Sequence, residues 1–409
     1  MAEDLSKKLY VENFDSWKKT ILRKRFVDDE LEVKVIEHGI VLPTRKINTS
    51  NAGGVCDNNF NFVAGFSRSY GGIYVDPWAS VESAYTVDKK DIVQLDEDVI
   101  FGGALIGHFG HFIMECWNRL WYVIQNPQLK SKILFILILG YKPYFDEFFR
   151  LMGINKERIV YVDKPMQCRS VTVPDQSQYS FINFTKEYLL PYLAIKSRVI
   201  PSNVKKLYLT RRIFDESYLK KIVSGEENLP RQAICFNEKY FEDFFAARGF
   251  KVIAPENLSV AEQLSLISGA DEIATTLGTL SNWAIFCKPE TKFIMLSRTS
   301  SMSVPFQCLV NEAVHLNNAY FVDASKNFMY ATHVLSVCML GANKYWKAFV
   351  ENYFGEQIKE DDDRPYFENA LDMYIYFWYK KYATEPKIML YTLKNMCNRI
   401  IALEKELER

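Results

Sequence analysis

The stretch from Phe250 to Thr276, FKVIAPENLSVAEQLSLISGADEIATT, decides the fold of the second half of the chain. The β-formers of FKVIAP precede a segment with helical spacing, SVAEQLSLISG, and a second short apolar run, EIATT, follows it. Ser259 and Glu262 form the S-x-x-E pattern of a capping box, and Gly269 is placed to end the helix. The order strand, helix, strand is typical of a parallel sheet.

The same alternation continues on both sides of this stretch. The strand LYLT and the helix NEKYFEDFFAARG precede it, and the helix LSNWAIFCK and the strand KFIML follow it. These elements predict an open, Rossmann-like parallel sheet, whose ligands usually bind outside the carboxyl ends of the strands.

A second α/β unit is predicted upstream. KILFILILG reads as a strand buried on both faces, YFDEFFRLMG as a helix and RIVYVD as the next strand. The first hundred residues read as short strands and turns, and the chain from about 343 onwards reads as helical apart from the acidic turn KEDDDRPY. We therefore predict an acceptor-side α/β domain with a β-rich start over 1–200, a Rossmann-like domain over 201–335 and a helical extension over 336–409.

Composition restricts the class of protein. Of the 409 residues, 48% are hydrophobic and 15% aromatic, which indicates a globular chain. Fifty basic residues balance fifty acidic ones, so charge gives no reason to expect a nucleic-acid partner. The aromatic excess fits either stacking surfaces for bases or sugars, or large cores.

The start of the chain has no apolar core of signal-peptide type, and the longest strongly apolar run, ILFILIL, is too short to span a bilayer. The eight cysteines lack CxxC spacing and read as reduced thiols. We predict a cytoplasmic protein. Basic and apolar residues occur together in WKKTILRKRF and in the last 25 residues, which leaves open a peripheral contact with the inner face of the plasma membrane, although a solvated helix face is the simpler interpretation.

The segment from Gly107 to Trp121, GHFGHFIMECWNRLW, is the first candidate for chemistry. On a helical wheel one polar arc holds His108, His111, Glu115, Asn118 and Arg119, and the rest of the circumference is mostly apolar. This pattern predicts a helix with one polar stripe on a cleft. The alternative is a buried structural network in which His111 and Glu115 simply bond to each other.

Two strand ends are candidates for anion binding. Arg211 and Arg212 follow LYLT, and arginine's fixed donors suit a phosphate, although such pairs are often only salt-bridged. In TTLGTLSNW, Gly278 follows a strand and a helix is predicted to begin near Ser281. The free backbone amides predicted for this turn would form an anion site, and they belong to Thr279, Leu280, Ser281 and Asn282. The alternative is an ordinary N-cap by Thr279 or Ser281.

Other chemistries have weaker support. HxxH is not the HExxH of a zinc helix, and DDD at 361–363 lies in a polar turn, so no metal site is predicted. A metallohydrolase built on His108, His111 and Glu115 stays the weakest alternative. No P-loop, GxGxxG or GxSxG pattern is present.

The motifs in this order resemble glycosyltransferase family 61, the capsular-polysaccharide type with a DUF563 domain. The resemblance runs from about 100 to 297 and rests on GHFIMECWNRL, LTRR and the continuous stretch from FNEKYFEDFF to KFIML. Three residues depart from the family pattern: Glu115 stands where Asp is common, Leu277 replaces a frequent histidine, and Thr279 replaces alanine.

The resemblance implies a GT-B-like fold, in which two Rossmann-like domains face a crevice and C-terminal helices follow. It also implies transfer without a bound metal or other cofactor, with positive groups stabilising the leaving nucleoside diphosphate. The donor would then contact Arg211, Arg212 and the turn Gly278–Asn282, with Val252, Ile253 and Pro255 bordering the base and Glu262 or Gln263 near the ribose. His111 is the first choice for the general base, with Glu115 orienting it or acting as the base itself, and Arg119 neutralising Glu115.

We therefore expect an inverting, metal-independent glycosyltransferase of surface-glycan synthesis. A nucleotide-sugar, by default a UDP-sugar, would be the donor, and a polysaccharide or lipid-linked oligosaccharide the acceptor. The rival is a non-catalytic nucleotide- or glycan-binding subunit of an assembly complex. The donor sugar, the linkage and the oligomeric state do not follow from the sequence.

Overall fold

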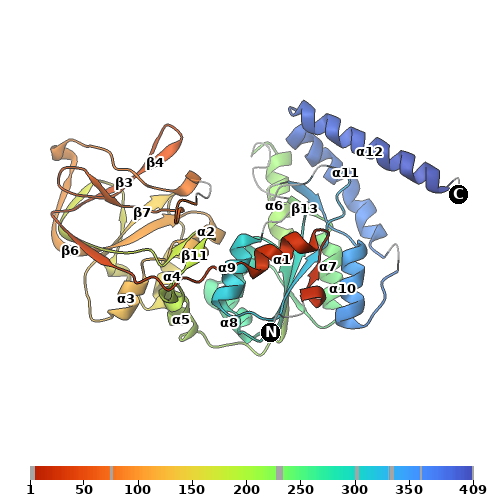
Figure 1. Cartoon of the computed structure of the whole chain (residues 1–409), viewed down its shortest axis with the longest axis horizontal. Coiled ribbons are helices and arrows are strands. Elements are labelled where there is room, and N and C mark those ends of the chain that lie inside the picture. Colours follow the sequence, from red (N-terminus) through yellow and green to blue (C-terminus); the bar gives the residue numbers. More distant parts are fainter. Residues whose placement is uncertain are drawn as a thin grey trace.

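The computed structural model describes residues 5–73, 77–226, 234–299, 304–329, 331, 336–359 and 362–407. It confirms a mixed α/β architecture. Two large sheets lie in separate halves of the molecule, one built mainly from the first 184 residues and one mainly from later residues (Figure 1).

The second sheet is parallel throughout. Its six strands run in the order β1-β17-β16-β15-β12-β14. They are β1 (Leu9–Tyr10), β12 (Lys206–Leu209), β14 (Lys251–Ile253), β15 (Glu272–Thr276), β16 (Lys292–Ser297) and β17 (Ala319–Asp323). If β1 is left out and the other five strands are numbered as they follow one another in the chain, their order across the sheet is 2-1-3-4-5. This order places a topological switch point at β12, which lies between β14 and β15.

The quoted stretch folds as its sequence predicts. Helix α8 (Val260–Gly269) connects β14 to β15, and Ser259 and Glu262 make both hydrogen bonds of the capping box. Strand β1 comes from the start of the chain, far from the other strands of this sheet in the sequence. It pairs with β17 at the sheet edge.

The first sheet combines a parallel core with an antiparallel extension. Its core strands, in the order β8-β7-β6-β9, are all parallel neighbours, and the predicted strand, helix, strand unit at KILFILILG is part of it. The eight strands are β2 (Val33–Glu37), β3 (Ile40–Ile47), β4 (Ser50–Cys56), β5 (Phe62–Ala64), β6 (Val93–Ile106), β7 (Ile133–Ile138), β8 (Ile159–Val162) and β9 (Met166–Pro174). In this core, β6 lies at the switch between β7 and β9.

Helices cover both sheets, and three of them follow one another at the end of the chain, as the sequence predicts (Figure 1). Two further short pairs are β10 (Gln178–Tyr179) with β11 (Asn183–Phe184), and β13 (Ile234–Phe236) with β18 (Val337–Met339). The remaining α-helices are α1 (Phe14–Leu22), α2 (Phe109–Glu115), α3 (Trp121–Gln125), α4 (Tyr144–Met152), α5 (Leu190–Lys196), α6 (Arg212–Val223), α7 (Glu238–Ala246), α9 (Pro305–Ala313), α10 (Lys344–Phe354), α11 (Arg364–Tyr382) and α12 (Pro386–Leu407).

One apolar core continues from the first half into the second. At the junction the rings of Phe109 and Trp283 lie 5.5 Å apart, and those of Tyr192 and Phe286 lie 5.6 Å apart. The largest fully buried side chains are mostly aromatic. The aromatic excess of the sequence therefore goes largely into the core and into the contact between the halves. Among the described residues, no helix combines the length and the apolar character needed to cross a bilayer.

Candidate active site

Helix α2 begins where strand β6 ends. Gly107 makes the turn, and a Cβ there would lie 2.5 Å from the carbonyl oxygen of Leu139, so only glycine fits the close approach to the end of β7. His108 is the N-cap of α2. Because β6 lies at the switch of its parallel core, α2 starts at the position where open α/β sheets bind ligands.

His111 and Glu115 form a short hydrogen bond on α2. Nδ1 of His111 lies 2.5 Å from Oε2 of Glu115. The Glu115 side chain is fully buried, whereas the His111 side chain is 22% exposed. Arg68 completes the arrangement, because its Nε lies 2.9 Å from Oε1 of Glu115 and its Nη2 donates to Ser180. The carboxylate thus holds Nδ1–H of His111, which leaves Nε2 as the nitrogen able to accept a proton.

Charge balance explains why Glu115 is ionised although it is buried. Burial alone would raise the pKa of the carboxyl, but the hydrogen bond and charge of His111 and the charge of Arg68 outweigh burial, and the pKa is lowered. An ionised Glu115 would stabilise an imidazolium at His111.

The predicted helix over Gly107–Trp121 is too long. Helix α2 ends at Glu115, and turns follow as far as α3. The carbonyl of Asn118 accepts hydrogen bonds from the backbone N and Oγ of Ser177, both at 2.8 Å, and this contact with a distant segment replaces the helical pattern. A buried segment can satisfy its backbone in this way without continuing a helix.

The role predicted for Arg119 is also wrong. Its guanidinium donates to the carbonyls of Pro174 and Gly65 and to Gln176, not to Glu115. Arg68 neutralises Glu115 instead. Arg119 therefore fixes the loop after β9, and burial lowers its pKa to about 10.

His108 lies beside His111, with ring centroids 5.0 Å apart. Its ring is partly exposed, yet the pKa of His108 is lowered to about 4, first by desolvation and then by the charges of His111 and Arg211. Arg211 belongs to the other half of the molecule, so a charge of that half acts on His108.

Aromatic rings frame His111. Trp78 and Phe306 meet its ring edge to face, at 5.2 Å and 5.9 Å. Trp78 is 38% exposed, and the Arg68 guanidinium lies 5.9 Å from its ring. These rings border the His111 side of the site with apolar surface.

The turn Gly278–Asn282 packs directly on α2. A Cβ at Gly110 would lie 3.1 Å from Oγ1 of Thr279, and Nδ2 of Asn282 approaches the carbonyl of Gly110 at 3.5 Å. The structure therefore brings together the histidine helix and the predicted anion turn, which are about 170 residues apart in the sequence.

The predicted free amides of this turn need a correction. The segment forms a 3-10 helix, Leu280–Phe286, and the amides of Ser281 and Asn282 close turns onto the carbonyls of Gly278 and Thr279. Oγ of Ser281 also accepts from the Gly278 amide at 3.1 Å. The amides still to be considered for an anion are those of Thr279 and Leu280.

Arg211 and Arg212 have different environments. The backbone amide of Arg211 donates to Glu238 at 3.1 Å, and its Nε pairs with Asp215 at 2.9 Å. Arg212 pairs with Glu242 at 3.0 Å and with Glu216 at 2.8 Å, and these carboxylates raise its pKa against the effect of burial. Arg212 is thus held in structural ion pairs, and Arg211 is the one of the two whose charge acts on His108.

Arg298 directly follows β16 and belongs to the candidate site, although it was not predicted from the sequence. It is only 9% exposed, and its Nη2 would lie 3.0 Å from a Cβ at Gly278. Burial acts against its charge, but the nearby thiols of Cys235 and Cys338 and the Asp215 carboxylate raise its pKa. Asp215 pairs with Arg211, and the charge of Arg298 also acts on it, but burial outweighs both arginines and raises the pKa of this carboxyl. The signal was present, because Arg298 stands at a strand end just as Arg211 does.

The remaining predicted donor contacts lie near the carboxyl end of β14. Val252 and Ile253 pack into different hydrophobic clusters, and Pro255 is buried. Glu262 is bound in its capping box, and Nε2 of Gln263 donates to the carbonyls of Pro255 and Leu258. Their roles toward a base or ribose stay predictions.

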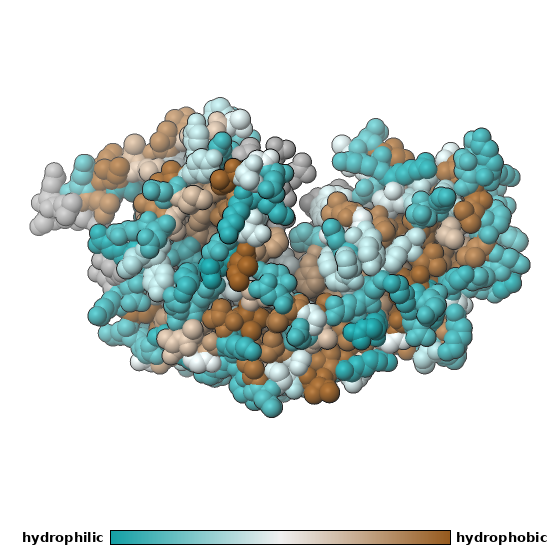
Figure 2. Space-filling view, turned by 180° about the vertical axis from the view of Figure 1, so that it is seen from behind, coloured by the Kyte–Doolittle hydropathy of each residue, from teal (hydrophilic) through white to brown (hydrophobic). Residues whose placement is uncertain are grey.

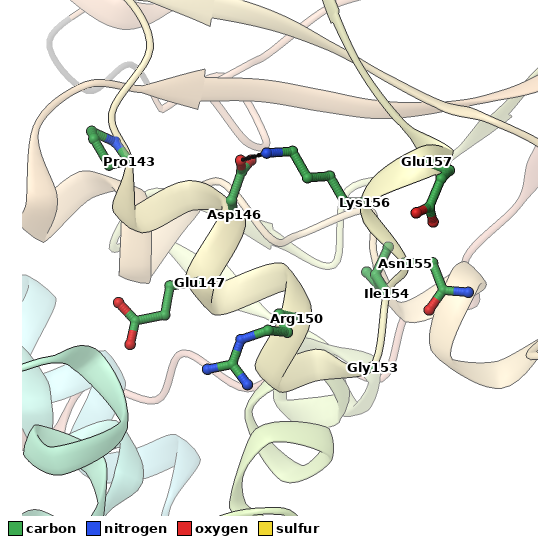
Figure 3. Close-up of a pocket in the computed structure, with 9 residues that line it drawn as sticks. All are labelled: Pro143, Asp146, Glu147, Arg150, Gly153, Ile154, Asn155, Lys156 and Glu157. Carbon is green, nitrogen blue, oxygen red and sulfur yellow. Dashed lines mark ion pairs between the residues drawn. The ribbon is translucent and has the colours of Figure 1, made fainter.

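A cavity of about 480 Å³ lies elsewhere, at α4 and the turn after it (Figure 3). Lys156 pairs with Asp146 at 3.1 Å in this cavity, and none of the predicted site residues lines it. The space-filling view is indented between the two halves of the molecule (Figure 2). Within the described ranges, no group of three or more His, Cys, Asp or Glu residues is arranged to hold a metal ion.

A histidine held by a buried carboxylate, opposite an arginine-rich strand-end site, has the parts needed for group transfer to a hydroxyl. Residues 109–294 match the family described as Glycosyltransferase 61. This region identifies the protein as similar to glycosyltransferase family 61, and the family implies a sugar donor and a glycan acceptor. No curated protein matches the chain. Arg68 and Arg298 lie outside the matched span.

Proposed function

We propose that the protein is an inverting, metal-independent glycosyltransferase of GT-B-like arrangement. Its donor is a nucleotide-sugar, by default a UDP-sugar, and its acceptor is a polysaccharide or a lipid-linked oligosaccharide of a surface glycan. One observation carries the proposal: the pair His111–Glu115, backed by Arg68, stands on helix α2, which contacts the turn Gly278–Asn282, and Arg298 lies against Gly278 of that turn.

The residues divide the reaction between them. Nε2 of His111 takes the proton of the acceptor hydroxyl while that oxygen forms a bond to the anomeric carbon. The bond from that carbon to the diphosphate breaks on the opposite face, so the configuration inverts and the nucleoside diphosphate leaves with the bonding electrons. Glu115 stabilises the imidazolium, and Arg211 and Arg298 stabilise the negative charge of the leaving group.

Two features of the site support a diphosphate at Arg211 and Arg298. Buried arginines are normally paired with anions, and here Asp215 pairs with Arg211 while its charge also acts on Arg298. Gly278, with φ of +144°, carries no side chain and leaves the turn open next to Arg298.

The first experiment is isothermal titration of UDP, GDP, CMP and CDP into the full chain, with and without EDTA. We expect micromolar binding of one nucleoside diphosphate that survives EDTA and is lost in Arg298→Met. Absence of binding by every nucleotide would overturn the donor site. Binding that needs a divalent ion would overturn metal independence.

The second experiment tests the base. The assay is the slow hydrolysis of UDP-sugars, in which water replaces the acceptor hydroxyl. The released UDP is measured over time. We expect His111→Asn to lower the rate of hydrolysis by about 10²–10⁴-fold and to leave nucleotide binding intact. Unchanged hydrolysis in His111→Asn would remove His111 as base. Nucleotide binding without turnover of any sugar donor would favour the non-catalytic subunit.

The site of action follows from the acceptor class. A lipid-linked or growing surface glycan is extended from cytoplasmic nucleotide-sugars, so we propose a cytoplasmic enzyme working near the inner face of the plasma membrane. Fractionation of cells into cytosol and membranes tests this location, and recovery of the enzyme outside the cytoplasm would refute it.

A further inference from the structure

Helix α12 is the longest helix described and lies at the outer edge of the second half, with its end projecting from the body (Figure 1). At 22 residues it is about 33 Å long. Its inner face is anchored: Ile388 packs on an apolar cluster, Thr392 is buried, and the Arg399 guanidinium lies 5.2 Å from the Phe328 ring.

The opposite face of α12 is apolar and exposed. At about 100° per residue, the exposed side chains form a continuous stripe that points away from Thr392 and Arg399. The stripe consists of Leu390, Leu393, Cys397, Ile400 and Ile401, of which the leucines and isoleucines are 48–70% exposed. Hydrophobic residues gather on the projecting segment at the upper left of Figure 2.

The spacing of this stripe is that of a coiled-coil seam. Leu390, Leu393, Cys397 and Ile400 alternate steps of three and four residues, which is the a/d pattern of a heptad. Glu404 continues the series at the next a position. A regular seam of this kind matches another helix better than an irregular surface.

Charge along α12 is uneven. From Pro386 to Arg399 the helix carries Lys387, Lys394 and Arg399 and no acidic residue, and Glu404 is its first carboxylate. Two copies in parallel would place like charges side by side. An antiparallel pair in a/d packing would place Cys397 opposite Ile400 of the partner subunit and Lys394 beside Glu404 of the partner subunit, twice by symmetry.

We propose that the exposed face of α12 is a dimerisation surface that binds the same face of a second copy of this chain in antiparallel orientation. Glu404 argues for a protein partner rather than a lipid surface. It lies within the apolar stripe, where lipid would desolvate its carboxylate, whereas an antiparallel copy provides a lysine. The proposal does not depend on the reaction catalysed in the crevice.

Sedimentation equilibrium of the full chain under reducing conditions tests the surface. We expect a dimer in the wild type and at least about tenfold weaker association in Leu393→Glu and in Ile400→Glu. The matched control is Ile200→Glu, because Ile200 is 84% exposed and lies far from α12 in the sequence. The control should dimerise like the wild type, and the far-UV circular dichroism of all three variants should match that of the wild type, because each replaces an exposed side chain.

A charge swap tests the orientation. Lys394→Glu and Glu404→Lys should each weaken the dimer about fivefold, because each places like charges together at two symmetric contacts. The double variant, K394E/E404K, should restore it. A monomer at about 100 µM, a dimer insensitive to Leu393→Glu, or no rescue in the double variant would each overturn the proposal. Flotation of wild type, but not of Leu393→Glu, with phosphatidylglycerol-containing vesicles would overturn it in favour of a membrane surface.

Discussion

Replacing Arg68 with methionine should destabilise the first half of the molecule, because it leaves the Glu115 carboxylate buried without its cation. The side chains are 3% and 0% exposed, so neither group can be solvated without unfolding. Removing one partner of a buried ion pair costs about 3–5 kcal/mol. Because Glu115 keeps its hydrogen bond with His111, we expect a loss of unfolding free energy at the lower end of this range, about 3 kcal/mol.

Urea unfolding followed by circular dichroism at pH 7.5 measures this free energy. For a unit of about 200 residues the expected loss corresponds to a fall in Tm of roughly 6–12 °C. Glu115→Gln is the partner variant, and the double variant R68M/E115Q removes both charges. We expect the double variant to be at least about 2 kcal/mol more stable than the sum of the single losses predicts.

The pH dependence gives a second check. The pKa of Glu115 is lowered in the folded protein below its ordinary value of 4.5, so the pair contributes stability above that pH and loses it as the pH falls through the folded value. The penalty of Arg68→Met should therefore be present at neutral pH and should decrease in acid. A loss below about 1 kcal/mol at pH 7.5, or a penalty independent of pH, would refute the assignment of Arg68 as the counter-ion.

Three further variants separate chemistry, binding and structure. His111→Asn should lower kcat by about 10²–10⁴-fold in a UDP-release assay with little change in nucleotide affinity, and a parallel loss of affinity would show a binding role instead. Arg298→Met should weaken nucleoside diphosphate binding at least about tenfold in calorimetry, whereas Arg212→Met should leave it unchanged, because Arg212 is committed to Glu242. Glu262→Ala should cost about 1 kcal/mol through loss of the capping box with Ser259 and should not alter nucleotide affinity, and weaker nucleotide binding would restore the ribose role.

Short sequence patterns predicted helices and strands well where neighbouring residues alone determine the structure. The boundaries of α8 follow from Ser259, Glu262 and Gly269, and these residues act within a single helix. The buried run at Ile133–Ile138 is a parallel strand for the same kind of reason, since only a strand covered on both faces is apolar throughout.

Contacts between distant segments account for what the sequence did not predict. Helix α2 ends at Glu115, and the Asn118 carbonyl beyond it accepts a hydrogen bond from Ser177. The sequence around α2 could not predict this contact, because Ser177 lies about 60 residues away. Strand β1 joins the second sheet through β17, more than 300 residues later. Arg68 lies in a loop whose neighbours give no periodic signal, and only the fold reveals that its Nε contacts Glu115.

Neighbouring arginines show most clearly why a motif alone does not assign roles. Arg211 and Arg212 follow the same strand, and both were predicted to bind a phosphate. Glu238 and Glu242, one turn apart on α7, separate them: the first accepts the backbone amide of Arg211, and the second binds the side chain of Arg212. The side chain of Arg211 instead pairs with Asp215, whose charge also acts on Arg298.

The two sides of the crevice therefore differ in charge balance, and the difference indicates what each side binds. On the α2 side the buried Glu115 carboxylate has Arg68 as its cation, so this side is neutral without a ligand and suits an uncharged hydroxyl near His111. On the other side the charges of Arg211 and Arg298 both act on one buried carboxylate, Asp215, and two arginines beside one carboxylate suit an anionic ligand. A neutral acceptor and an anionic leaving group are the two reactants that this distribution of charge fits.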